Sequence, residues 1–312
     1  MQRYILKRML QAAVTIILVS MVIFVLARLS GNPLDLLLPP EATLADRQAM
    51  SEALGLNKPI LTQYGIFAKN AVRGDFGESI KWDEPAWNLV WSRFPNTLQL
   101  AVLAMSLNVM VGLTLGMYSA LRPGGMLDSF GKVFALLGQS VPTFWTGIML
   151  ILILSVQLHL LPTSGKGPGL GELQGWKHLI MPAFTLGWFG MASTVRLSRS
   201  AMLDVLDSEF IKMVRIKGLP ERTVIWKHAL KNASIPILTL AALQFAGLLN
   251  GSVIVEVIFA WPGMGRLAYD AVLARDFPVV QTAVFVGSSI FISANLLVDI
   301  AYAYLDPRIR YQ

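Results

Sequence analysis

Long apolar stretches dominate this sequence and restrict what the chain can fold into. A helix needs roughly 20 mostly apolar residues to cross a hydrocarbon core of about 30 Å. Stretches of about this length lie at about Met9 to Leu26, Thr97 to Leu121, Val133 to Leu158, Ile180 to Val195, Pro236 to Phe259 and Thr282 to Leu305. The sequence therefore predicts an all-α, polytopic transmembrane helical bundle of about six spans.

The residue composition agrees with a chain whose solvent is lipid. Of its 312 residues, 54% are hydrophobic and only 14% are charged. A formal net charge of +7 would suit nucleic-acid binding in a soluble protein, but here we expect the lipid bilayer and no nucleic acid as the partner. The absence of cysteine excludes disulfides, thiolate metal sites and cysteine nucleophiles, and it leaves the compartment undecided.

The first apolar stretch has the basic start that a secretory signal peptide also has, with Arg3, Lys7 and Arg8 before it. The residues from Leu29 to Pro33 follow it in place of a small-x-small cleavage site. We therefore interpret the stretch as an anchored transmembrane helix.

The pattern of apolar and polar segments divides the chain into consecutive parts. These are an N-terminal transmembrane helix at 1–28, a long polar segment at 29–95, a transmembrane part at 96–305 that includes a loop at 196–236, and a tail at 306–312. The polar segment carries charges of both signs and short amphipathic pieces at Asp46 to Leu54 and Gln63 to Val72. We expect it to be a structured extramembrane segment.

Basic residues concentrate in the loop at 196–236, and they set the orientation. The loop holds Arg196, Arg199, Lys212, Arg215, Lys217, Arg222, Lys227 and Lys231. Because short basic loops face the cytoplasm, this loop should be cytoplasmic. Six spans then place both termini in the cytoplasm and the long polar segment outside, in the periplasm of a bacterium. We expect a multi-pass protein of the inner (plasma) membrane.

Local signals inside this loop predict a helix, a glycine turn and a second helix. Asp207 and Ser208 are good N-caps for a first helix that ends near Gly218, and Pro220 and Glu221 suit the first turn of a second. The first helix carries the apolar residues Phe210, Ile211, Met213 and Val214. Such a hairpin suits docking into a groove on a partner protein, although a loop that only orients the bundle stays open.

Breaks and polar side chains interrupt the spans. Pro142 should bend or break the third span, because proline removes a backbone donor. Polar residues at or near membrane depth are Asn108, Gln139, Gln244, Asn250, Asn295 and Asp299. For the amides we favour hydrogen bonds between helices over direct contact with a substrate, and for Asp299 we expect snorkelling or ion pairing.

The segment Glu209 to Pro236 resembles the EAA loop of binding-protein-dependent ABC importer permeases, in the dipeptide, oligopeptide and nickel branch. The Glu-Ala-Ala of the family falls on Lys212, Met213 and Val214, so those letters are absent, whereas the family glycine falls on Gly218. Similar runs cover nearly the whole chain, among them Asn32-Pro33, Gly74-Asp75-Phe76-Gly77, Val141-Pro142-Thr143-Phe144-Trp145 and Trp261-Pro262-Gly263-Met264-Gly265-Arg266.

The resemblance implies a MetI-like fold of the ABC type I importers and a permease that forms half of a translocation path for di- or oligopeptides. Nickel chelates and glutathione are alternative cargoes. The implied partners are a second homologous permease, two ATP-binding subunits that carry ATP and Mg, and a periplasmic solute-binding protein. We expect no cofactor or metal on this chain and no enzyme activity, because it lacks a P-loop and its three histidines lack metal-ligand spacing.

The resemblance also nominates residues. Those that would couple to the ATPase are Glu209, Lys212, Met213, Val214, Lys217, Gly218, Leu219 and Arg222. Candidates for the translocation path or a gate are Gln139, Ser140, Pro142, Gln244, Asn250, Glu256 and Trp261. We expect the segment around Trp261 to be exposed at the membrane interface. For Glu256, a functional role and a buried salt bridge or cap are both open.

Two other classes of protein compete with this interpretation. An ion- or proton-coupled secondary transporter should show inverted repeats and paired broken helices, but we find one clear proline break and no convincing repeat. A membrane-bound enzyme would need convergent nucleophilic, metal or acid–base groups, and none is apparent.

Overall fold

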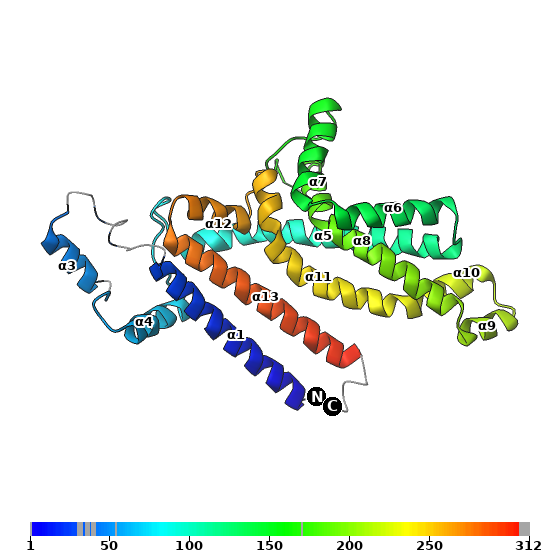
Figure 1. Cartoon of the computed structure of the whole chain (residues 1–312), viewed down its shortest axis with the longest axis horizontal. Coiled ribbons are helices and arrows are strands. Elements are labelled where there is room, and N and C mark those ends of the chain that lie inside the picture. Colours follow the sequence, from blue (N-terminus) through cyan, green and yellow to red (C-terminus); the bar gives the residue numbers. More distant parts are fainter. Residues whose placement is uncertain are drawn as a thin grey trace. The chain divides into compact units, whose positions relative to one another are not determined.

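The structure is a computed structural model that describes residues 2–29, 34, 38, 42–53, 55–169 and 171–305. Helices make up almost all of this part of the chain, and it contains no strand beyond a single bridge between Glu78 and Pro85. The chain divides into two compact units (Figure 1). Unit 1 comprises Met1–Asn96 and Gly263–Gln312, and unit 2 comprises Thr97–Pro262.

Unit 1 contains the first and the last long helix. Its elements are α1 (Gln2–Leu29), α3 (Leu44–Ala53), α4 (Ile60–Val72), the start of α5 (Ala86–Leu121), α12 (Met264–Leu273) and α13 (Phe277–Leu305). Helices α1 and α13 pack side by side (Figure 1), and Arg8 Nη1 lies 3.1 Å from Asp299 Oδ2. The ion pairing expected for Asp299 is therefore present. The two amphipathic pieces of the polar segment correspond to α3 and α4, and the tail at 306–312 lies outside the described residues.

Unit 2 is organised around one central helix. Its elements are the rest of α5, α6 (Met126–Ser140), α7 (Thr143–Leu150), η1 (Ile151–Gln157), α8 (Leu173–Leu206), α9 (Glu209–Ile216), α10 (Glu221–Thr223), η2 (Val224–Ala229) and α11 (Leu230–Ile258). Helix α8 packs against α6, α7 and α11. Glycines let α5 approach α8 closely, because a Cβ built on Gly112 would lie only 2.5 Å from Thr194 Cβ.

Several helices are long and apolar enough to span a membrane. Within the described residues four helices meet both criteria, at Ile5–Leu26, Ala86–Leu121, Glu221–Leu249 and Phe277–Ile300. The bent pair of α6 with α7 and η1 raises the number to five if it counts as one span. The remaining expected span lies in α8, which has 34 residues but carries Lys177 near its start and Arg196, Arg199 and Asp204 toward its end. An all-α polytopic membrane bundle is thus confirmed.

The break predicted at Pro142 is confirmed. Helix α6 ends at Ser140, Pro142 is the N-cap of α7, and the two segments are bent by 111°. Each half closes its own hydrogen bonds, because Val141 N donates to Leu137 O at 2.9 Å and Thr146 N donates to Pro142 O at 3.1 Å. The proline therefore separates two complete helices and does not leave one distorted helix.

A buried carboxylate fixes the polar segment to the start of α13. Asp276 is fully buried, and its Oδ2 accepts hydrogen bonds from Ser79 Oγ at 2.5 Å and from Lys81 N at 3.1 Å. Its Oδ1 accepts from Val279 N at 3.4 Å in the first turn of α13. Three donors from two distant parts of the sequence thus converge on one side chain.

We predict that Asp276→Ala lowers the stability of unit 1 by about 2 kcal/mol or more, because it leaves buried donors without their charged acceptor. The measurement is the thermal unfolding midpoint of the purified protein in detergent. The control is Asp75→Ala, which removes an exposed carboxylate that accepts one hydrogen bond from Gly77 N at 3.1 Å. Equal midpoints for the two variants would contradict the prediction.

Candidate functional site

The loop between α8 and α11 begins with the short helix that the sequence predicts. Ser208 is the N-cap of α9, and its Oγ accepts a hydrogen bond from Ile211 N at 3.4 Å. At the other end, Lys217 N donates to Met213 O at 3.1 Å and Gly218 N donates to Arg215 O at 2.9 Å. The predicted start and stop of this helix are confirmed.

Gly218 has a left-handed backbone with a φ of +75°. A Cβ added there would meet nothing within 4 Å, so the chain itself leaves room for a side chain. The requirement for glycine comes from the backbone, since L-residues cost about 1–2 kcal/mol in this conformation. This conformation allows the loop to reverse between α9 and α10.

The apolar residues of α9 divide into a buried and an exposed set. Ile211 and Val214 are buried in a cluster with Met117 of α5, Met202 of α8 and Val224 of η2. The exposed set comprises Phe210 at 49% exposure, Met213 at 58% and Ile216 at 85%. We call this set, together with Leu219, which follows α9 and is 39% exposed, the apolar face of the loop. Val214 therefore anchors α9 to the bundle, whereas the apolar face remains open.

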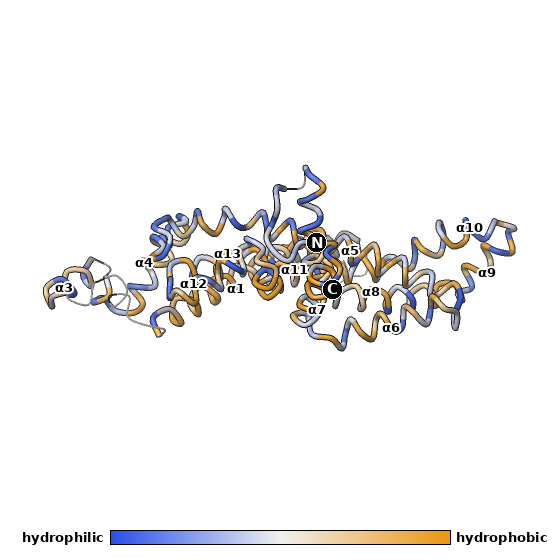
Figure 2. Tube along the Cα trace, turned by 90° about the horizontal axis from the view of Figure 1, so that it is seen from above, coloured by the Kyte–Doolittle hydropathy of each residue, from blue (hydrophilic) through white to orange (hydrophobic). Residues whose placement is uncertain are grey.

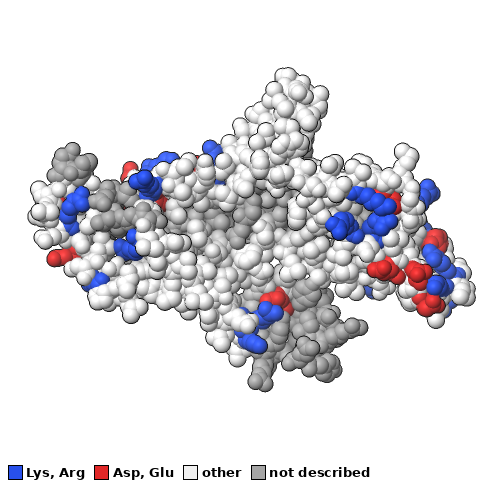
Figure 3. All heavy atoms as spheres, viewed as in Figure 1, with Lys and Arg blue, Asp and Glu red and all other residues white. Residues whose placement is uncertain are grey.

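Charged side chains of both signs gather on the part of unit 2 that carries α9 and α10 (Figure 3). Arg215 pairs with Glu221 across the turn at 2.7 Å, and Lys212 pairs with Glu209 at 2.9 Å within α9. Along α9 and α10, hydrophilic and hydrophobic residues alternate (Figure 2). Such exposed pairs contribute little to stability, so their main effect is to keep the loop polar around its apolar face.

The second helix predicted to begin at Pro220 and Glu221 is confirmed, and it is continuous with the next span. Pro220 is the N-cap of α10, but the chain then continues through η2 into α11. Glu221–Leu249 forms one apolar span of 29 residues. No turn therefore separates the second arm from α11.

A buried hydrogen-bond network joins three helices of unit 2. Asn108 of α5 is fully buried and donates through Nδ2 to Gln244 Oε1 of α11 at 2.6 Å. Thr194 Oγ1 of α8 donates to Asn108 Oδ1 at 2.7 Å. The interhelical hydrogen bonds expected for these amides are confirmed. The side chain of Asn250, a candidate for the path, lies outside the described residues.

Two other path candidates, Gln139 and Ser140, are exposed at the end of α6 beside the bend at Pro142. Gln139 Oε1 accepts a hydrogen bond from Arg196 Nη1 at 2.5 Å, and its Nε2 donates to Ser193 Oγ at 3.4 Å. These contacts connect α6 to α8. The candidates therefore lie on one surface formed by the two helices.

Sequence reasoning missed an ion cluster at the start of α6. Asp128 is fully buried, and it accepts hydrogen bonds from Arg199 Nε at 2.5 Å and Gly124 N at 2.8 Å. Lys132 Nζ lies 2.9 Å from the same carboxylate. The signal that could have found it is the i, i+4 spacing of Asp128 and Lys132.

Glu256 and Trp261 are both buried. Glu256 Oε1 accepts a hydrogen bond at 2.7 Å from Thr97 Oγ1, a partner that sequence reasoning did not identify. Trp261 is only 1% exposed, and its backbone N–H donates to the backbone oxygen of Glu256 at 2.8 Å. The expectation of an exposed interfacial segment at Trp261 is therefore wrong. The indole buries more apolar area among Leu100, Leu179 and Phe259 than it would at an interface.

Residues suited to metal binding do not converge. No group of three or more His, Cys, Asp or Glu side chains in the described part of the chain could hold a metal ion. Within that part, His178 bonds through Nδ1 to Ser164 O at 3.0 Å.

Comparison with known families finds two matches that together cover most of the chain. Residues 112–311 match the family described as binding-protein-dependent transport system inner membrane component. Residues 1–101 match the N-terminal part of the binding-protein-dependent transport system membrane component.

Full-length relatives give the same result. The chain is 38% identical over 317 residues to the oligopeptide transport system permease protein AppB of Bacillus subtilis (strain 168). It is 38% identical over 313 residues to the glutathione transport system permease protein GsiC of Escherichia coli (strain K12). It is 37% identical over 333 residues to the dipeptide transport system permease protein DppB of Alkalihalophilus pseudofirmus. Each comparison covers 100% of both chains.

One solved structure supports the fold. A chain of an amino acid ABC transporter, crystallised with histidines, superposes with a TM-score of 0.53 at 16% identity. The superposition covers 70% of this chain and 94% of that chain. The helical arrangement is therefore shared even where the sequences have diverged.

We predict that Asn108→Ala lowers stability by about 1–2 kcal/mol, because it removes two hydrogen bonds between helices. Thermal unfolding in detergent measures the effect. Asn295→Ala is the matched control, since the amide of Asn295 bonds to Phe291 O of its own helix at 3.1 Å. If Asn295→Ala is as harmful as Asn108→Ala, the network does not hold the helices together.

Proposed function

This chain belongs to the family of binding-protein-dependent transport system inner membrane components, and we propose that it is a permease subunit of an ATP-driven importer for small peptides. Two of its relatives are named for oligopeptide and dipeptide transport and one for glutathione, itself a short peptide. Peptides are thus the cargo class with the widest support. Glutathione or a nickel chelate would be handled by the same type of complex.

The observation that carries this proposal is the exposed apolar face of the loop. Phe210, Met213 and Ile216 lie on α9, a helix that is itself anchored by buried side chains, and Leu219 follows it after the glycine turn. Exposed apolar residues at helical spacing are typical of a helix that docks into a groove. A loop that only set the orientation of the bundle would need its positive charges but not this face.

The anchoring gives the loop a mechanical role. Ile211 and Val214 fix α9 to α5 and α8, and the second arm continues into α11. A partner that pushes on the apolar face therefore moves a packed unit and not a loose segment. We assign the partner role to two ATP-binding subunits, which carry the ATP and Mg, because this sequence contains no P-loop.

The remaining partners in the proposed complex have separate roles. A second, homologous permease completes the path, and a periplasmic solute-binding protein delivers the cargo. The basic loop faces the cytoplasm together with both termini, as the positive-inside rule requires. Gln139, Ser140 and Gln244 contribute to the path, whereas the buried Glu256 and Trp261 support the segment between α11 and α12.

We predict that the double variant Met213→Asp/Ile216→Asp inserts normally but loses its ATP-binding subunits. Two charges on the apolar face would have to be desolvated at the interface, so retention of these subunits should fall at least tenfold. Co-purification in mild detergent measures this. The control is Leu44→Asp, which places a charge on an 83% exposed apolar residue of α3. Intact complexes with the double variant would refute the docking face.

We further predict an order among substitutions of Gly218. Gly218→Asn should retain most of the substrate-stimulated ATP hydrolysis of the reconstituted importer, because asparagine tolerates a left-handed backbone. Gly218→Val should lose most of it, because a β-branched residue strains the turn. Normal coupling with valine would show that the conformation of Gly218 does not matter.

A further inference from the structure

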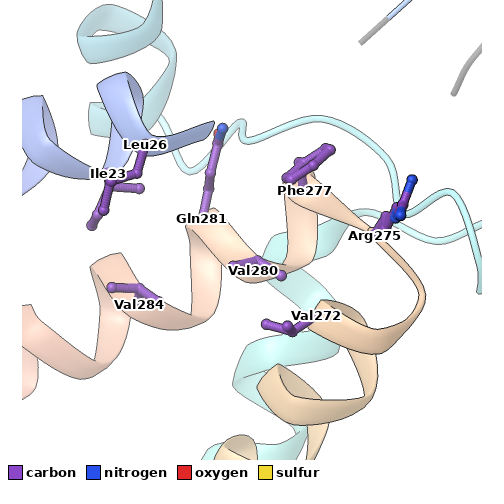
Figure 4. Close-up of a pocket in the computed structure, with 8 residues that line it drawn as sticks. All are labelled: Ile23, Leu26, Val272, Arg275, Phe277, Val280, Gln281 and Val284. Carbon is purple, nitrogen blue, oxygen red and sulfur yellow. The ribbon is translucent and has the colours of Figure 1, made fainter. Parts of the chain in front are cut away.

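A cavity of about 410 Å³ lies in unit 1 among α1, α12 and α13 (Figure 4). Six of its eight lining residues are apolar, including Ile23 and Leu26 from α1 and Val280 and Val284 from α13. Arg275 and Gln281 supply the polar groups. Its volume falls within the range of about 300–1,000 Å³ that is typical of small-molecule sites.

The cavity lies beside the ends of two apolar spans. One apolar span ends at Leu26 and another begins at Phe277, so both have their ends beside the cavity. Val280 and Val284 lie inside the second span, whereas Arg275 lies just outside it. In Figure 4, Gln281, Phe277 and Arg275 lie along one side of the cavity and Val284, Val280 and Val272 along the other. The polar groups of the lining are therefore on one side, opposite these three valines.

Lipid is the natural occupant of a cavity at this depth. Only 17% of the residues in the apolar windows of α1 and α13 are buried inside the structure, so both helices expose broad apolar surfaces. An apolar cavity with few polar partners does not hold water well. A hydrocarbon chain can instead make van der Waals contacts with the valine, isoleucine and leucine side chains that line the cavity.

Arg275 occupies a position where glycine is usual. It follows Ala274, the C-cap of α12, and has a φ of +56°. Its N–H donates to Val272 O at 3.1 Å, which closes the end of the helix. Helices commonly end on a left-handed glycine at this point, and a side chain there costs free energy. A positive charge after the C-terminus of α12 is favourable for the helix dipole, but it does not require a left-handed residue that carries a side chain. The guanidinium at this position is therefore available to a ligand in the cavity.

We propose that this cavity binds a membrane phospholipid. One acyl chain packs against Ile23, Leu26, Val280 and Val284, and the phosphate accepts hydrogen bonds from the guanidinium of Arg275. Arginine suits this role because its planar donors match phosphate oxygens in pairs. The amide of Gln281 lies on the same side of the cavity and donates to the headgroup.

The test measures phospholipid retention by native mass spectrometry of the importer purified in dodecyl maltoside from vesicles of phosphatidylglycerol and phosphatidylethanolamine. Arg275→Gly removes the guanidinium and relieves the backbone, so loss of folding cannot explain its effect. Val284→Trp fills the apolar side of the cavity. Arg73→Gln is the control, since Arg73 is an exposed arginine outside the cavity.

We expect the wild type and Arg73→Gln to retain one bound phospholipid. Arg275→Gly should retain about tenfold less of it, and Val284→Trp should retain none. In lipid-free detergent, Arg275→Gly should unfold at the same temperature as the wild type or higher. Equal retention by Arg275→Gly or by Val284→Trp would overturn the proposal. So would a lower unfolding temperature for Arg275→Gly in lipid-free detergent, or displacement of the lipid by inorganic phosphate alone, which would indicate a site for a free anion.

Discussion

Inside a hydrocarbon core no water is present to bond the backbone, so every N–H and C=O there must find a partner within the protein. This constraint explains why the described part of the chain is built from helices and why its one proline break separates two complete helices. At Pro142 the chain bends by 111°, yet α6 and α7 both close their own hydrogen bonds. At the bend, Val141 N still donates to Leu137 O and Pro142 O still accepts from Thr146 N.

Polar side chains obey the same constraint. Asn108, Asp128 and Glu256 are all fully buried, and each accepts or donates hydrogen bonds shorter than 3 Å to a partner on another helix. Their partners lie far away in the sequence: Gln244 is 136 positions from Asn108, and Glu256 is 159 positions from Thr97. Such pairs determine which helices are neighbours, because lipid solvates apolar surfaces on all helices equally well.

The loop between α8 and α11 shows how far local sequence signals reach. Ser208 and Gly218 were predictable as the start and the end of α9, because capping and a left-handed backbone depend on single residues. The division of the apolar residues was not predictable, since burial of Ile211 and exposure of Met213 depend on how α9 lies on α5 and α8. The same reason explains the error at Trp261, whose surroundings come from α5, α8 and α11.

The sequence by itself determined the class of protein, the location of most spans, the break at Pro142, the basic loop and the family. These properties follow from apolar length, from proline and glycine chemistry, and from motifs that are continuous in the chain. Only the tertiary structure decided which polar residues pair, which apolar residues of α9 remain open, and where Arg275 stands relative to the ends of α1 and α13. A transmembrane helix is apolar around most of its circumference, so its sequence carries little information on which side faces a neighbour. Packing of the helices supplies that information.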